Sequence, residues 1–74
     1  MNFKQCFFRI YDKKIASGEI SFSKTGISKD AFTLLCTEPG YVFDQELIDK
    51  LKETMKLTDE QYEQLTRTAA GEEL

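Results

Sequence analysis

The sequence predicts an α+β fold in which an N-terminal antiparallel β-hairpin is followed by three short α-helices packed on one sheet face. Two observations lead to this prediction. Residues 3–11 and 15–23 each fit a strand, the first apolar on both faces and the second apolar on one face, and a short polar link joins them as in a hairpin. Downstream, three segments each carry an apolar residue, a helix-capping residue and, four positions after the cap, a second apolar residue.

The hairpin is predicted to span residues 3–23. A three-residue turn at 12–14 aligns the apolar positions of both strands on one face, and side-chain alternation fixes that register wherever the face is buried. This face consists of Cys6, Phe8 and Ile10 from the first strand and Ala16, Gly18, Ile20 and Phe22 from the second. We expect the helices to pack on it.

The opposite face of the first strand is also aromatic, which makes it the candidate interaction face. It carries Phe3, Phe7, Arg9 and Tyr11. Three aromatic side chains are unusual on a surface that faces water, and they predict that something covers this face. Three coverings fit the sequence: one of the chain's own helices, a second copy of the chain, or a different protein.

The first helix is expected over residues 29–37. Ser28 is a suitable N-cap, and Ile27 before it can pack on Phe32 one turn into the helix. The apolar content of residues 31–36 also fits a strand, and this alternative stays open.

The second helix is expected over residues 45–56 and the third over residues 59–70. Asp44 is the N-cap of the second helix, and its apolar stripe is Leu47, Ile48, Leu51 and Met55. Thr58 and Gln61 have the spacing of a capping box at the start of the third. Its inward positions are Tyr62, Leu65 and Ala69.

The chain length predicts a single domain over residues 1–74, with residues 71–74 fraying. No apolar run approaches the roughly 20 residues that span a bilayer, and the N-terminus lacks the apolar core of a secretory signal. We therefore expect a soluble, cytoplasmic protein.

The charge is distributed unevenly along the chain. Residues 1–37 carry six basic and three acidic residues, whereas residues 38–74 carry four basic and ten acidic ones. Such a split suggests a partner that binds in one orientation, or head-to-tail association between copies of the chain. Within the acidic half, the third helix presents a secondary acidic surface of Asp59, Glu60 and Glu63.

The composition argues against an enzyme. The chain has no histidine, the commonest general base and metal ligand. Cys6 and Cys36, both expected to be buried, have no histidine to activate them and are too few for a structural zinc site. The four glycines form no phosphate-binding loop. We expect neither a catalytic residue nor a metal or cofactor.

The leading hypothesis is a small, non-enzymatic protein-interaction or regulatory accessory module. It would act through the face of Phe3, Phe7, Arg9 and Tyr11, on a protein partner or on itself as a homodimer. Replacing Phe7 with serine is then expected to leave the monomer folded and abolish binding. No membrane or small-molecule substrate is inferred.

Two alternatives remain. The aromatic and basic residues of the hairpin also fit a platform for single-stranded nucleic acid. The acidic surface of Asp59, Glu60 and Glu63 fits an inhibitor that imitates nucleic acid, of the kind found among small phage and mobile-element proteins.

Overall fold

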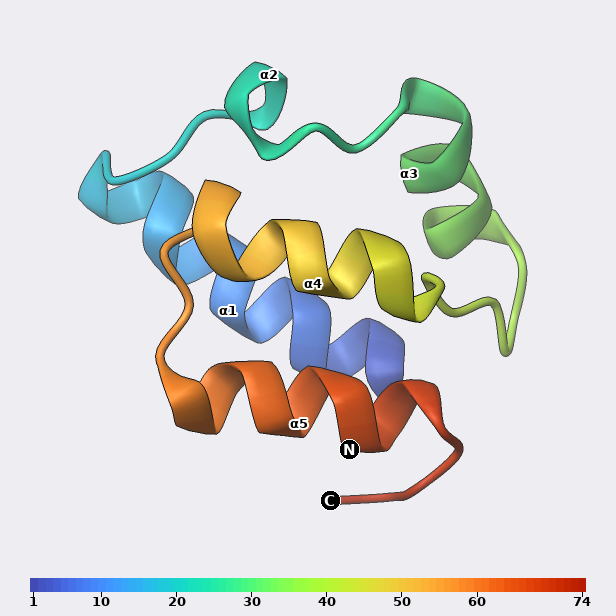
Figure 1. The fold of residues 1–74 in the computed structure, drawn as a ribbon. Helices are drawn as coiled ribbons and strands as arrows, with labels where there is room; N and C mark the ends of the chain where they lie inside the picture. Colours follow the sequence, from blue (N-terminus) through green and yellow to red (C-terminus); the bar gives the residue numbers. More distant parts are fainter.

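The computed structural model describes residues 1–74 and contains five α-helices and no strand (Figure 1). The helices are α1 (Phe3–Ser17), α2 (Phe22–Thr25), α3 (Lys29–Thr37), α4 (Gln45–Thr54) and α5 (Asp59–Ala69). In Figure 1, α4 lies in front, α2 lies above it, α5 lies below it and α1 runs behind. Helix α5 packs against both α1 and α4, and α2 packs on α4.

The predicted α+β fold is wrong, because residues 3–17 form the longest helix instead of a strand and a turn. The buried side chains of α1 are Phe3, Cys6, Phe7, Ile10 and Lys14. Their spacing of three and four residues places them on one helical stripe. The apolar residues of this segment satisfy a period of 2 and a period of 3.6 together, and packing against α5 selects the helix.

Capping residues at both ends of α1 also favour a helix over residues 3–17. The Asn2 side chain accepts a hydrogen bond from the Gln5 backbone N–H at 2.9 Å, and the Gln5 side chain accepts one from the Asn2 N–H at 3.0 Å. This reciprocal pair is a capping box. At the other end, Gly18 has a φ of 78°, and its N–H donates to the Ile15 carbonyl at 3.1 Å. A left-handed glycine at this position terminates a helix.

The second predicted strand, residues 15–23, is also absent. Its residues form the last turn of α1, a connector and the start of α2. Within the connector, Ile20 is buried in the core. The Thr25 hydroxyl at the end of α2 donates to the Phe22 carbonyl at 2.7 Å and accepts from the Ile27 N–H at 3.2 Å. These bonds fix the short α2 and direct the chain toward α3.

The three downstream helices are confirmed, and residues 31–36 are helical, so the strand alternative is wrong. Helix α3 has the predicted bounds, while α4 ends two residues and α5 one residue earlier than predicted. Each predicted N-cap accepts a backbone N–H: Ser28 from Ala31 at 3.0 Å, Asp44 from Leu47 at 2.8 Å and Thr58 from Gln61 at 3.1 Å.

The core is a single cluster to which every helix except α2 contributes buried hydrophobic side chains. Phe7 and Phe43 lie at its centre, with their rings edge to face and 5.3 Å between centroids. The other members are Phe3, Cys6, Ile10, Ile20, Ile27, Leu35, Ile48, Leu51, Met55, Leu57 and Leu65. Burial on this scale is what holds helices that are too short to be stable alone.

Hydrogen bonds connect the ends of neighbouring helices. The Thr54 hydroxyl at the end of α4 donates to the Thr25 carbonyl at the end of α2, at 2.9 Å. The Lys4 ammonium group in the first turn of α1 donates to the Cys36 carbonyl near the end of α3, at 3.0 Å. The elements around the surface are therefore tied by specific bonds as well as by the core.

The two ends of the chain lie side by side (Figure 1). The Leu74 N–H donates to the Met1 carbonyl at 3.0 Å, and the Met1 ammonium group bonds in return to the Leu74 carbonyl. That ammonium group also pairs with Glu73 at 3.0 Å. Residues 71–74, expected to fray, return to the start of α1. None of the five helices combines the length and the hydropathy needed to cross a bilayer.

Candidate functional site

The structure does not bring Phe3, Phe7, Arg9 and Tyr11 together on one exposed face. Phe3 and Phe7 are enclosed in the core, with 2% and 0% of their surface exposed. Arg9 is exposed, and Tyr11 is half-buried. Of the three coverings considered, the chain's own elements cover Phe3 and Phe7, since both rings pack edge to face on Phe43.

Tyr11 belongs instead to a cluster of four half-buried aromatic rings. Phe32 of α3 is its centre, with ring centroids 5.7 Å from Phe8, 5.6 Å from Tyr11 and 5.0 Å from Phe22. Phe8 and Tyr11 themselves lie edge to face at 6.3 Å. Edge-to-face pairs at these separations attract one another beyond simple burial, so the rings hold each other in place.

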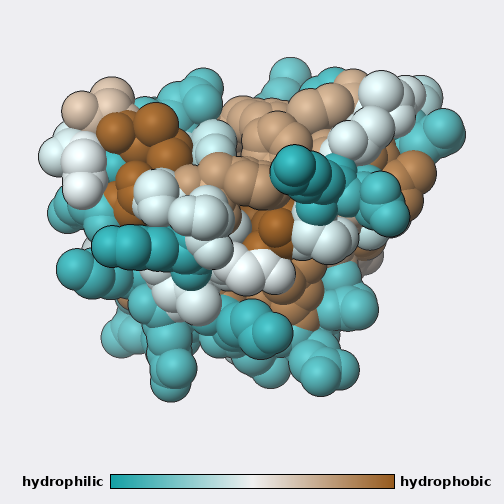
Figure 2. Space-filling view, turned by 90° about the horizontal axis from the view of Figure 1, so that it is seen from above, coloured by the Kyte–Doolittle hydropathy of each residue, from teal (hydrophilic) through white to brown (hydrophobic).

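Three of these rings, those of Tyr11, Phe22 and Phe32, line a shallow surface groove between α1 on one side and α2 and α3 on the other. A hollow of about 340 Å³ lies over it, bounded by Tyr11, Phe22, Lys29, Phe32 and Thr33. We call Tyr11, Phe22 and Phe32, with Lys29 and Thr33 at the rim, the aromatic groove; Phe8 packs on Phe32 but does not bound the hollow. Figure 2 views the molecule from the α2 side and shows hydrophobic surface there between hydrophilic side chains.

The aromatic groove has one charged side chain at its rim and one tyrosine hydroxyl in its lining. Lys29 is the one charged residue that bounds the hollow, and it forms no ion pair within the chain. Burial raises the pKa of the Tyr11 hydroxyl, and the neighbouring Asp12 carboxylate raises it further. Tyr11 is therefore a neutral hydroxyl at physiological pH.

The sequence does not predict the aromatic groove, because the predicted hairpin places Phe8 and Phe22 on the inner face of a sheet. A signal was nonetheless present. At helical spacing, Phe8, Tyr11 and Ile15 follow one another on a stripe next to the buried one. Ile15 is 38% exposed, which makes it one of three large hydrophobic residues with open surface.

Arg9 lies in a different, polar groove between α1 and α5. Arg9 and Lys13 line it from α1, and Glu60 and Gln64 line it from α5. The predicted acidic surface of Asp59, Glu60 and Glu63 is exposed on the first turns of α5. Basic groups accompany it, since Asp59 pairs with Lys52 at 3.3 Å and Glu60 shares the polar groove with Arg9.

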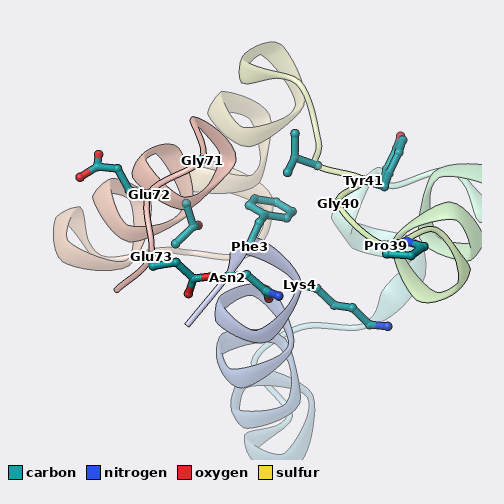
Figure 3. A pocket seen from close by; sticks show the side chains of 11 residues that line it. Asn2, Phe3, Lys4, Pro39, Gly40, Tyr41, Gly71, Glu72 and Glu73 are labelled. Atoms are coloured by element: carbon teal, nitrogen blue, oxygen red, sulfur yellow. The ribbon is translucent and has the colours of Figure 1, made fainter.

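A third groove, of about 390 Å³, lies where the start of α1, the turn at residues 39–41 and the C-terminal residues meet (Figure 3). Its charged side chains already have partners within the chain. Lys4 bonds to the Cys36 carbonyl, Glu72 pairs with Arg67 at 3.0 Å and Glu73 pairs with the Met1 ammonium group. In Figure 3, Lys4 and Glu72 point to opposite sides of the groove, so the two side chains do not converge on one ligand position.

The two cysteines lie in different surroundings. Cys6 is buried, and burial raises the pKa of its thiol, although a hydrogen bond with Thr68 opposes this. Cys36 is exposed, so the expectation that both are buried is wrong for Cys36. Both thiols are free, and no three side chains of the types that bind metals are grouped together.

No protein-family model matches the chain, and neither the curated proteins nor the solved structures include a significant match.

Proposed function

We propose that this protein is a small interaction module that holds an apolar segment of another protein in the aromatic groove. The observation that carries the proposal is the cluster of Phe8, Tyr11, Phe22 and Phe32, four half-buried rings of which Tyr11, Phe22 and Phe32 bound a hollow. Aromatic side chains in such pockets dominate the energy of many protein interfaces.

The aromatic groove is suited to binding because its rings are already in position. Phe32 contacts the other three rings, and these come from α1 and α2. Helix α1 is in turn held by the core and by the bond from Lys4 to Cys36. A preorganised site loses little conformational entropy on binding, so more of the interaction energy remains as affinity.

The alternatives have less support. Phe3 and Phe7, on which a platform for nucleic acid relied, are in the core and have no ring face free for a base. Basic groups interrupt the acidic surface that would imitate nucleic acid, since Lys52 pairs with Asp59 and Arg9 shares a groove with Glu60.

The test uses one substitution that fills the hollow and a matched one that does not. Thr33 is exposed at the rim of the groove, so Thr33→Trp places a large side chain in the hollow and removes none of the four rings. Leu34 is the next residue of α3, is 40% exposed and does not bound the hollow. Leu34→Trp therefore adds the same side chain outside the binding site.

Random peptides of about 12 residues, displayed on phage, are selected against the wild-type protein, since segments of this length fill helix-binding grooves. We expect enriched peptides that bind wild type and Leu34→Trp equally and bind Thr33→Trp at least tenfold more weakly. Circular dichroism on all three proteins checks that the helices are retained. Equal binding to both variants, or a selection that enriches no peptide, would overturn the proposal.

Self-association is measured on the same proteins by sedimentation equilibrium. A wild-type dimer that Thr33→Trp converts into a folded monomer would identify a second copy as the segment held in the groove. A dimer that persists in Thr33→Trp would place any self-association elsewhere on the surface.

A further inference from the structure

We infer that the aromatic groove takes one aromatic side chain of its partner, with tryptophan preferred, as the anchor of the bound segment. This inference rests on the proposed function, because it names the chemistry of the group that the groove holds. Its support is the arrangement of the three rings, the size of the hollow and the lysine at the rim.

The three rings that bound the hollow are steeply inclined to one another. Phe32 is the common member, with Phe22 at 5.0 Å and an angle of 81° between the ring planes, and Tyr11 at 5.6 Å and 56°. A group that enters the hollow therefore meets aromatic surface in more than one direction. Such an arrangement offers an inserted ring both edge-to-face and offset contacts, which attract aromatic groups more strongly than aliphatic ones of similar area.

The size of the hollow fits one ring system with the backbone that carries it. Its volume is about 340 Å³. A closed apolar cavity of about 150 Å³ already accommodates a benzene ring, so the hollow has room for the two fused rings of an indole. Five residues bound the hollow, whereas a standard interface takes roughly 20–30 residues a side. A second copy held by this groove alone would therefore not form a stable dimer.

The charge at the rim favours an aromatic ring over the other compact groups that could enter. Lys29 is the one charged residue that bounds the hollow, and it has no ion pair in the chain. An ammonium group is attracted to the face of an aromatic ring, as the Lys52 ammonium is to Tyr62, 4.9 Å from the ring centroid. A leucine side chain offers no such face.

A methylated ammonium group is the other ligand that clustered aromatic rings bind. Lys29 opposes it, because two positive charges at one small site repel each other. A neutral ring avoids this repulsion. The Asp12 carboxylate, which acts on the Tyr11 hydroxyl but does not bound the hollow, does not oppose a neutral ring either.

The first test uses three small probes: N-acetyl-tryptophanamide, N-acetyl-leucinamide and N-acetyl-trimethyllysinamide. Binding is followed by the backbone amide signals of the full chain in NMR titrations. We expect tryptophanamide to shift the signals of Phe22, Lys29 and Thr33 and to bind at least threefold more tightly than either of the other probes. Thr33→Trp should abolish these shifts, and Leu34→Trp should retain them.

The second test removes one ring from the groove. Phe22 lies outside the buried core, so Phe22→Leu is expected to remain folded. The variant should bind tryptophanamide at least threefold more weakly than wild type does and should lose its preference over leucinamide. A merely structural effect of the substitution would weaken both probes equally.

The third test removes the charge at the rim. Lys29→Met keeps the apolar stem and is expected to weaken tryptophanamide about two- to fivefold, as for an exposed cation over a ring, without weakening leucinamide. The matched control is Lys13→Met, which removes a lysine from the polar groove between α1 and α5 and should change neither affinity.

The peptides selected on phage connect the probes to a partner segment. Each peptide that is lost on Thr33→Trp is expected to contain a tryptophan, phenylalanine or tyrosine whose replacement by leucine weakens binding at least tenfold. Leucine at the other positions of the peptide should have smaller effects, because one side chain occupies the hollow.

The outcomes separate the two proposals. Groove-dependent peptides that tolerate leucine at every aromatic position would overturn the aromatic anchor and leave the interaction module standing. The same conclusion would follow if leucinamide or trimethyllysinamide bound as tightly as tryptophanamide, or if Phe22→Leu bound tryptophanamide as wild type does. Peptides that fail to distinguish Thr33→Trp from Leu34→Trp would overturn both proposals.

Discussion

The buried ammonium group of Lys14 donates a hydrogen bond to the backbone carbonyl of Lys56, at 3.0 Å. The two residues are 42 positions apart, and their contact joins the last turn of α1 to the end of α4. Glu19 provides a carboxylate 3.5 Å from the same ammonium group. Lys14 is only 8% exposed, so the Lys56 carbonyl and the Glu19 carboxylate replace most of the water that the ammonium group of a lysine would otherwise bind.

Lys14→Met is expected to lower the free energy of unfolding by about 1–2 kcal/mol. Methionine keeps the apolar stem but leaves the Lys56 carbonyl without its charged donor. Urea unfolding followed by circular dichroism measures the change. The matched variant is Lys13→Met on the exposed side of α1, which should stay within about 0.5 kcal/mol of wild type. Equal stability of the two variants would show that the bond from Lys14 contributes nothing.

Lys56→Gly is expected to stabilise the protein by about 0.5–1 kcal/mol. Lys56 has a φ of 53°, a left-handed conformation that strains any side chain with a Cβ atom. Its side chain is exposed, so little contact is lost. Lys56→Ala is the control, because alanine keeps the Cβ and the strain, and it should give no gain in the same urea experiment. A gain from alanine as large as that from glycine would exclude backbone strain as the cause.

Phe7→Ser is expected to unfold the chain, which reverses the sequence-based expectation for this variant. Phe7 has no exposed surface and packs on Phe3, Phe8, Tyr11 and Phe43. Removing a buried phenylalanine destabilises by about 3–5 kcal/mol, which is the whole stability of many domains of this size. Circular dichroism should show the loss of helix.

Phe7→Leu is the matched control, because it keeps an apolar side chain and is expected to remain folded with a loss of about 1 kcal/mol. A folded Phe7→Ser protein would contradict the central position of this ring.

Tyr62→Phe is expected to raise the pKa of Asp49 toward its usual value. Hydrogen bonds from the Tyr62 hydroxyl and then from Gln45 lower the pKa of Asp49 in the folded protein. The folded state therefore favours the carboxylate, and this stabilisation is complete above the pKa of the unfolded chain, about 3.9. It is lost as the pH falls through the lower pKa of the folded protein. The variant removes the first hydrogen bond, so stability should depend less on pH below about 4.

The titration of each carboxyl group is followed by carbon-detected NMR. Glu72 is the internal control, since its pKa is lowered by Arg67 on a different part of the surface and should not change. Phenylalanine keeps the ring over which Lys52 lies, so that contact is retained. An unchanged pKa of Asp49 in Tyr62→Phe would assign the shift to Gln45 instead.

The three downstream helices could be predicted because their signals are local. Ser28, Asp44 and Thr58 each cap a helix through a backbone N–H three residues away, and no distant contact is needed. Residues 3–17 carry equally local signals in the capping box of Asn2 and Gln5 and in Gly18, but their apolar residues also alternate. If the capping signals at the two ends are given more weight than the alternation of apolar residues, the sequence predicts the helix over residues 3–17.

The candidate site could not be predicted from the sequence, because it depends on how helices pack. Phe32 meets Phe8 and Tyr11 across more than 20 positions of sequence, and nothing local to α1 indicates that α3 lies beside it. The same holds for Lys14, whose burial requires the carbonyl of Lys56. The aromatic residues of the N-terminal segment are evident in the sequence, but their division between core and surface is set by tertiary structure.

Because Met1 and Leu74 are hydrogen-bonded to each other, the first and last residues described are neighbours in space. A short glycine-rich linker could join the two ends without moving a helix, because the first and last residues already share backbone hydrogen bonds. New ends could then be opened at Pro39 and Gly40, which are exposed and lie between α3 and α4. Such a circular permutant would connect α5 directly to α1, the two helices that already pack together. The five helices would keep their neighbours while the order in which they are synthesised changes.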